Sequence, residues 1–388
     1  MRREKLLVGA LLLLVFALWP ASPAYAQIGK FVPIQAGSDA DHVMAEINAA
    51  TDPAQKLVLI DKFAAGPGRQ GDMAIVADDL YVNHYIAAKN YDKAFEYGDK
   101  LFALDPDNFS NALNMVRAAA EKGDPDKLFS YGETASTILQ RYKAAPAPAG
   151  MSEDAWKDRR AQTLQDVHDS VTYIEQLLFN GAYQTRDVTK RAGLLVKFAQ
   201  LFPDSQYASQ ALGVAAASYR QTQSTPKMLE VANGILAKDP NNIGMLLLLA
   251  DYYSEKGEQL DKAESYAKKA ISGLESAKKP EGVSDDQWQK QNALQKGLAL
   301  SALGQVNIQK KDNVQAVQNF NTAALLLKSD EGSYARNQYR LGFALLNLKK
   351  PAEAKVAFTQ AASVNTPYKA LAEEKLKSMP AGTTARRN

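Results

Sequence analysis

The sequence lacks cysteine altogether and has three histidines in 388 residues. Disulfides, thiolate metal sites, cysteine nucleophiles and lipid-modified cysteines are therefore excluded. His42, His84 and His168 are scattered and show no metal-ligand spacing, and the motifs GxSxG, HExxH and a phosphate-binding glycine loop do not occur. The 46 basic and 43 acidic residues nearly balance, at a net charge of +3, which disfavours a dedicated nucleic-acid binder. We expect no catalytic residue, no metal, no cofactor and no nucleic-acid partner.

The first 26 residues have the features of a secretory signal peptide. Basic residues within 2–5 precede an apolar run over 6–19, and the tripeptide 24–26 (Ala-Tyr-Ala) is the small-x-small pattern of a cleavage site. The apolar run is shorter than the ~20 residues that a membrane-spanning helix needs. We expect cleavage after Ala26, no integral membrane segment afterwards, and a periplasmic or secreted protein. The alternative is an uncleaved membrane anchor.

Two stretches near the C-terminus repeat one pattern at a separation of 38 residues. The matching residues are Leu303, Gly304, Ala316, Phe320 and Ala323 in one copy and Leu341, Gly342, Ala354, Phe358 and Ala361 in the other. Small residues at such positions let two helices approach closely, and the phenylalanine fills the space on the neighbouring turn. The pattern resembles the tetratricopeptide repeat, a pair of antiparallel helices.

Weaker copies of the pattern extend upstream, and we count about seven helical pairs between residues 74 and 368. The predicted fold is all-α, a right-handed α-α superhelix. The expected parts are a signal peptide (1–26), an N-terminal helical segment (27–73), repeats (74–143), a linker (144–152), repeats (153–276), a second linker (277–284), repeats (285–368), a terminal helix (369–379) and a disordered tail (380–388).

A larger duplication is superimposed on the repeats. The sequence of 105–108 (Asp-Pro-Asp-Asn) recurs at 239–242 as Asp-Pro-Asn-Asn, and the first linker motif recurs in the second. In each linker a serine, Ser152 or Ser284, is followed by two acidic residues and then a tryptophan, which is typical of an N-cap with a hydrophobic staple. The alternative is that the two tryptophans form a contact site.

The resemblance implies a concave groove lined by the first helix of each pair. The best-known groove of the family binds a terminal carboxylate with Lys, Arg and Asn. Asn83 and Asn114 occupy matching positions in consecutive units, and Arg117 lies one turn further on. Asp79 stands where a Lys is wanted and would repel a carboxylate, so we expect that clamp to be incomplete.

Further along the chain the phase of the repeats directs another set of polar side chains inward. Tyr and Arg are common among the few residues that contribute most of the binding energy at protein–protein interfaces. The alternative is that these side chains only solvate the groove. The set consists of Asp251, Gln305, Gln309, Arg336 and Tyr339.

The pattern as a whole predicts an exported repeat scaffold or adaptor that binds a partner protein or peptide in its groove without covalent chemistry. The alternative is a structural component of a cell-envelope assembly, oligomeric or membrane-anchored. A hydrolase that uses repeats for specificity would need a catalytic domain, and the repeats leave no stretch for one.

Overall fold

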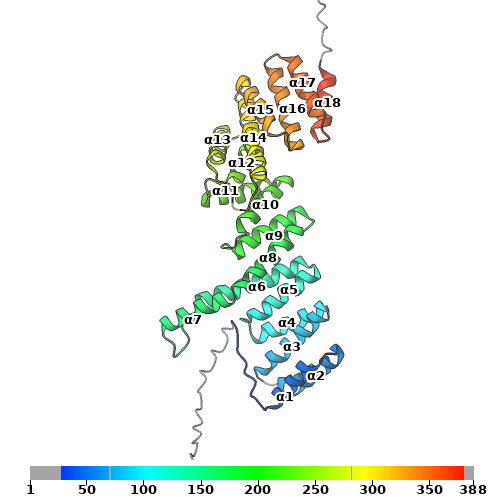
Figure 1. The fold of residues 1–388 in the computed structure, drawn as a ribbon, viewed down its shortest axis with the longest axis vertical. Coiled ribbons are helices and arrows are strands. Elements are labelled where there is room, and N and C mark those ends of the chain that lie inside the picture. Colours follow the sequence, from blue (N-terminus) through cyan, green and yellow to red (C-terminus); the bar gives the residue numbers. More distant parts are fainter. Residues whose placement is uncertain (1–27, 70, 281, 380–388) are drawn as a thin grey trace, which may run out of the picture. The chain divides into compact units, whose positions relative to one another are not determined.

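The computed structural model describes residues 28–69, 71–280 and 282–379, which form two compact units (Figure 1). Unit 1 extends to Gly181, and unit 2 begins at Ala182. The expected signal peptide, its cleavage site and the expected tail at 380–388 lie outside the described residues. The described part is helical apart from its connecting segments and contains no strand, so the predicted all-α repeat fold is confirmed.

Unit 1 consists of consecutive helices joined by short turns. They are α1 (Asp39–Ala49), α2 (Pro53–Ala65), a 3-10 turn (Pro67–Arg69), α3 (Met73–Ala87), α4 (Tyr91–Leu104), α5 (Phe109–Lys122), α6 (Pro125–Ala144), α7 (Glu153–Asp166) and α8 (His168–Gln184). The unit boundary falls within α8. Leu178 of α8 is fully buried and lies directly against Gly132 of α6, which ties most of α8 to unit 1.

Unit 2 continues the same organisation. Its helices are α9 (Val188–Leu201), α10 (Ala208–Gln221), α11 (Thr225–Lys238), α12 (Ile243–Lys256), α13 (Leu260–Ser276), α14 (Asp285–Gln309), α15 (Asn313–Leu326), α16 (Glu331–Asn347), α17 (Pro351–Ala362) and α18 (Tyr368–Ser378). The pairs α12/α13, α14/α15 and α16/α17 pack along their lengths, and α18 packs on α17.

Polar side chains at the helix starts explain where many helices begin. Ser152 caps α7 and Ser284 caps α14, each accepting a hydrogen bond from a backbone N–H in the first turn, and Gln287 completes a capping box with Ser284. Trp156 is buried and its indole N–H donates to the carbonyl of Ala145 at 2.9 Å. The repeated linker motif therefore starts a helix in both copies.

The turns inside the helical pairs share a backbone feature. Lys89, Gln223, Lys311 and Lys349 have positive φ angles of 56°, 56°, 65° and 59°, each just past the end of the first helix of a pair. A left-handed residue at this position ends the helix and turns the chain back toward it. Lys311 and Lys349 are 38 residues apart, which is the spacing of the sequence repeat.

Within the pairs, glycine on the first helix faces an aromatic ring on the second. A Cβ atom on Gly304 would lie 2.6 Å from the ring of Phe320, and one on Gly342 would lie 2.5 Å from the ring of Phe358. Both phenylalanines are fully buried. Between consecutive pairs of unit 1, Gly98 of α4 lies against the side chain of Met115 of α5.

We expect Gly342→Ala to destabilise unit 2 by about 2 kcal/mol, because the added methyl group must displace a fully buried ring. Gly213 of α10 is the matched control, since nothing lies within 4 Å of a Cβ atom there. Gly213→Ala should stabilise the chain by about 0.5–1 kcal/mol through helix propensity. Urea unfolding of the two variants measures both changes, and equal effects would contradict the packing argument.

Candidate functional site

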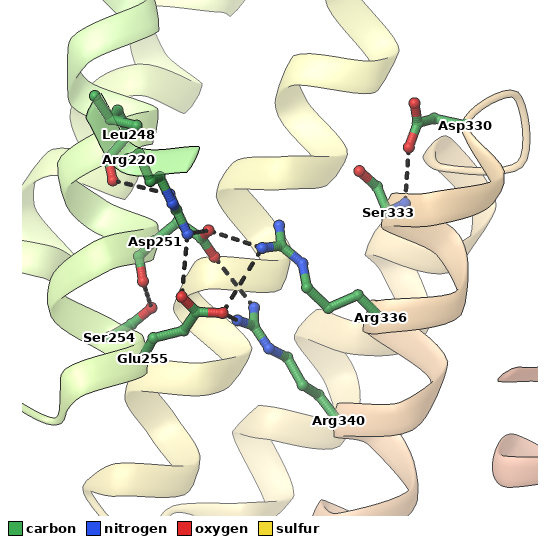
Figure 2. A network of polar contacts seen from close by, with 9 residues as sticks. All are labelled: Arg220, Leu248, Asp251, Ser254, Glu255, Asp330, Ser333, Arg336 and Arg340. Atoms are coloured by element: carbon green, nitrogen blue, oxygen red, sulfur yellow. Dashed lines mark hydrogen bonds and ion pairs between the residues drawn. The ribbon is translucent and has the colours of Figure 1, made fainter. Parts of the chain in front are cut away.

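Five charged side chains of unit 2 meet over the ribbon of α14 (Figure 2). We call them the charge cluster: Arg220 of α10, Asp251 and Glu255 of α12, and Arg336 and Arg340 of α16. Arg336 donates to Asp251 at 2.8 Å, and Arg340 donates to Asp251 at 3.2 Å. These contacts join side chains 85 and 89 residues apart in the sequence.

The other contacts of the charge cluster bring in Glu255 and Arg220. Arg340 donates to Glu255 at 2.8 Å, and Arg220 donates to Glu255 at 3.1 Å and also to Asp251. The spacing within each helix makes this possible, because Asp251 and Glu255 are one turn apart on α12, as Arg336 and Arg340 are on α16. Each pair presents two charges on one helix face.

Asp251 accepts hydrogen bonds from all three arginines of the charge cluster, and its side chain is only 12% exposed. Burial by itself would raise the pKa of the Asp251 carboxyl. The guanidinium groups of Arg340, Arg336 and Arg220 outweigh this and hold the pKa well below its ordinary range. Asp251 is thus a permanent carboxylate at physiological pH, and it fixes three arginines.

Beside the charge cluster lies a pocket of about 330 Å³, which we call the unit-2 pocket. It is lined by Glu255, Gln305, Ile308, Tyr339, Arg340, Phe343, Asn347 and Tyr368. The rings of Tyr339, Phe343 and Tyr368 form one aromatic wall, with 5.0 Å between the centroids of Tyr339 and Phe343 and 5.7 Å between those of Tyr339 and Tyr368. Burial, followed by the nearby charge of Glu374, raises the pKa of the Tyr339 hydroxyl.

The structure brings together four of the residues singled out from the sequence. Asp251 and Arg336 belong to the charge cluster, while Gln305 and Tyr339 line the unit-2 pocket. Gln309, one turn after Gln305 at the end of α14, does not line the unit-2 pocket, and its side chain is 3.5 Å from the Cβ position of Gly257. The phase of the repeats thus indicates which side of the first helices carries these side chains.

The remaining three candidates lie in unit 1. The amide of Asn114 donates to the side-chain oxygen of Asn83 at 3.5 Å, and Asn83 in turn donates to the carboxylate of Asp79 at 3.0 Å. Burial raises the pKa of Asp79, and the hydrogen bond from Asn83 opposes that shift. The Nε atom of Arg117 is buried and makes no hydrogen bond within the described part of the chain. The Asp79 carboxylate thus accepts a hydrogen bond from the Asn83 amide, the group that a carboxylate ligand would need as its donor.

The sequence interpretation missed Arg220, Glu255, Arg340, Phe343 and Tyr368. A signal was present for three of them, since Glu255, Arg340 and Phe343 each lie four residues after a chosen residue and so share its helix face. In the described ranges, no group of three or more His, Asp or Glu is arranged to hold a metal ion. The helices described are all too short or too polar to cross a membrane.

Comparison with known proteins identifies one repeat directly. Residues 335–367 match the tetratricopeptide repeat family, a range that holds most of α16 and all of α17. No curated protein matches the sequence significantly.

Among solved structures the chain is similar to helical proteins at low identity. The apo form of the quorum sensor NprR from B. thuringiensis is 14% identical, with a TM-score of 0.33, over 89% of this chain and 82% of that chain. Yeast Tom70 is 13% identical, with a TM-score of 0.34, over 90% and 65%. The TPR domain of P58(IPK) is 14% identical, with a TM-score of 0.24, over 88% and 98%.

Removing the buried carboxylate should damage unit 2 far more than removing its exposed neighbour. We expect Asp251→Asn to destabilise the fold by about 3 kcal/mol, because three largely buried guanidiniums lose their shared partner. Glu255→Gln is the matched control and should cost about 1 kcal/mol or less, because the Glu255 side chain is 41% exposed and screened by water. Urea unfolding at neutral pH distinguishes the two, and similar losses would contradict the role given to Asp251.

The same carboxylate predicts a pH dependence. The folded-state pKa of Asp251 is lowered, so its stabilisation is complete above the unfolded-state pKa of about 3.9 and is lost as the pH falls toward the folded value. The stability difference between wild type and Asp251→Asn should therefore shrink by on the order of 1 kcal/mol between pH 5 and pH 3. Unfolding curves at the two pH values test this, and an unchanged difference would exclude it.

Proposed function

We propose that the protein is a helical-repeat scaffold that binds an extended segment of a partner protein in the unit-2 pocket. The observation that carries the proposal is the combination of an aromatic wall with charged groups held in fixed positions. Tyr339, Phe343 and Tyr368 offer apolar contact area, and aromatic residues concentrate binding energy at interfaces. Tyr339, Arg340, Phe343 and Asn347 also lie within the range that matches the repeat family, whose concave surfaces bind other proteins.

The charges beside the pocket favour a ligand with an acidic group. The charge cluster has three guanidiniums and two carboxylates, so one positive charge is not compensated within it. Arg220 and Arg340 keep their orientation through the carboxylates, which lowers the entropy cost of binding an anion. The preferred segment places an apolar side chain against the aromatic wall and a carboxylate near Arg340, the arginine of the charge cluster that lines the pocket.

The proposed mechanism is docking, without covalent chemistry. The lowered pKa of Asp251 makes this carboxylate a poor general base, because it binds a proton only at low pH. The arginines around it are effectively always protonated. Rigidly held side chains with permanent charges can bind a charged ligand, but they are poorly suited to transferring a proton.

We further propose that the protein works in the periplasm or outside the cell. The basic start, apolar run and Ala-Tyr-Ala tripeptide of residues 1–26 support export with cleavage after Ala26. N-terminal sequencing of the protein purified from its native cells tests this. A first residue of Gln27 supports export with cleavage, and an intact Met1 contradicts it.

The binding proposal is tested by photocrosslinking in living cells. A photoreactive amino acid at Gln305 lies in the unit-2 pocket, and one at Val314 is the control, since Val314 is 58% exposed on α15, the second helix of its pair. We expect one dominant partner protein crosslinked from position 305 and at least tenfold less of it from position 314. Equal yields at the two positions, or crosslinks only to other copies of the chain, would contradict the proposal.

A further inference from the structure

The first described residues of the chain lie against unit 1 and form no helix or strand. Ile28 is 2% exposed, and its carbonyl accepts a hydrogen bond of 3.2 Å from the backbone N–H of Phe109, the first residue of α5. The backbone N–H of Lys30 donates to the carboxylate of Asp105 at 2.9 Å. The Lys30 ammonium pairs with Asp72 at 3.2 Å. Main-chain and side-chain contacts thus hold a short segment, residues 28–30, on the surface.

Glycine is required in the middle of this segment. Gly29 has a φ of +116°, and a Cβ atom there would lie 2.8 Å from the Asp105 carboxylate, 3.0 Å from Cα of Asn108 and 3.1 Å from the carbonyl oxygen of Asp107. A side chain would meet two backbone atoms that cannot move without distorting the turn before α5. The sequence Ile-Gly-Lys therefore fits the surface in a residue-specific way.

The internal duplication supplies a reference for this surface. The turn 105–108 recurs at 239–242, and in both copies the first Asp accepts a backbone hydrogen bond from the Asn three residues later. Asp105 is 2% exposed, whereas its counterpart Asp239 is exposed, and among the described residues the Asp239 carboxylate accepts hydrogen bonds only from its own turn. The two turns share sequence and differ in that the first one is covered by residues 28–30.

The segment does not fill the space available to it. A hollow of about 480 Å³ lies under Lys30, Phe31 and Val32 and is lined on the other side by residues of α3 and α5, including Ile75 and Val76. Phe31 is 62% exposed and so fills little of this hollow, whose lining also includes the polar residues Asp79, Asn108 and Ser110. Residues 28–30 are thus held by hydrogen bonds and an ion pair, whereas Phe31 is loosely packed. Such partial packing is expected of a segment that can dissociate from its site.

We propose that unit 1 carries a peptide-binding site that the chain fills with its own residues 28–30. When this segment is displaced, the site accepts an extended segment from another protein with the same order of a branched apolar residue, a glycine and a basic residue. The site involves unit 1 alone, so it stands or falls independently of the unit-2 pocket. A tethered occupant competes at an effective concentration in the millimolar range, which keeps the site closed in the resting chain.

The test uses the full chain and a fluorescent peptide with the sequence of residues 27–34. Gly29→Val should displace the internal segment, and Gly37→Val is the control, because Gly37 also has a positive φ of 76° but has nothing within 4 Å of its Cβ position. Fluorescence anisotropy should show the peptide binding at least tenfold more tightly to Gly29→Val than to wild type or Gly37→Val. Affinities within twofold of one another would overturn the proposal.

A second pair of variants shows where the peptide binds. In the Gly29→Val background, Asp105→Ala should weaken peptide binding at least fivefold, because it removes the acceptor for the Lys30 N–H, and Asp239→Ala should change nothing. Binding that is equally sensitive to both substitutions would contradict the site. If Gly29→Val does not fold, the rate of hydrogen exchange of the Phe109 amide tests the proposal, because this amide donates to the Ile28 carbonyl. It should be at least tenfold faster in Asp105→Ala than in Asp239→Ala, and equal rates would overturn the proposal.

Discussion

The close approach of paired helices is the constraint on which the rest of unit 2 depends. A glycine on the first helix faces a buried phenylalanine on the second at Gly304 and Phe320, and again at Gly342 and Phe358. A larger residue at either glycine would push the two helices apart. Because the pairs α14/α15 and α16/α17 are held at this distance and α14 packs against both α12 and α16, the first helices α12, α14 and α16 present their side chains at a defined spacing.

The charge cluster depends directly on that spacing. Arg336 and Arg340 reach past α14 to a carboxylate on α12, and Asp251 lies within hydrogen-bond distance of three guanidiniums. Such a cluster stabilises the fold only when all members are paired, since a buried charge without a partner is costly. The same contacts fix the edge of the unit-2 pocket at Arg340 and Glu255, so side chains that stabilise the fold also line the proposed binding pocket.

The fold could be predicted from the sequence because helical repeats leave a periodic signal. The site could be predicted only in part. Repeat phase indicated one side of the first helices, but it could not show that Arg340 reaches α12, which depends on helix spacing in three dimensions. The docking of residues 28–30 left no periodic signal at all, because three residues outside helices and strands are fitted to the surface by shape and by Gly29. The duplication of the turn 105–108 was visible in the sequence, but the packing of residues 28–30 on this turn was not.

The most direct test of the account is selection of peptides from a random library against the full chain, with the Phe343→Ala variant as counter-screen. The account predicts enriched peptides that combine an aromatic or branched apolar residue with a nearby Asp or Glu and that bind the variant at least tenfold more weakly. Phe343 lines the pocket without joining the charge cluster, so the variant keeps the ion pairs that hold unit 2 together. Enrichment of basic peptides, or of peptides that bind both chains equally, would contradict the unit-2 pocket as the binding site.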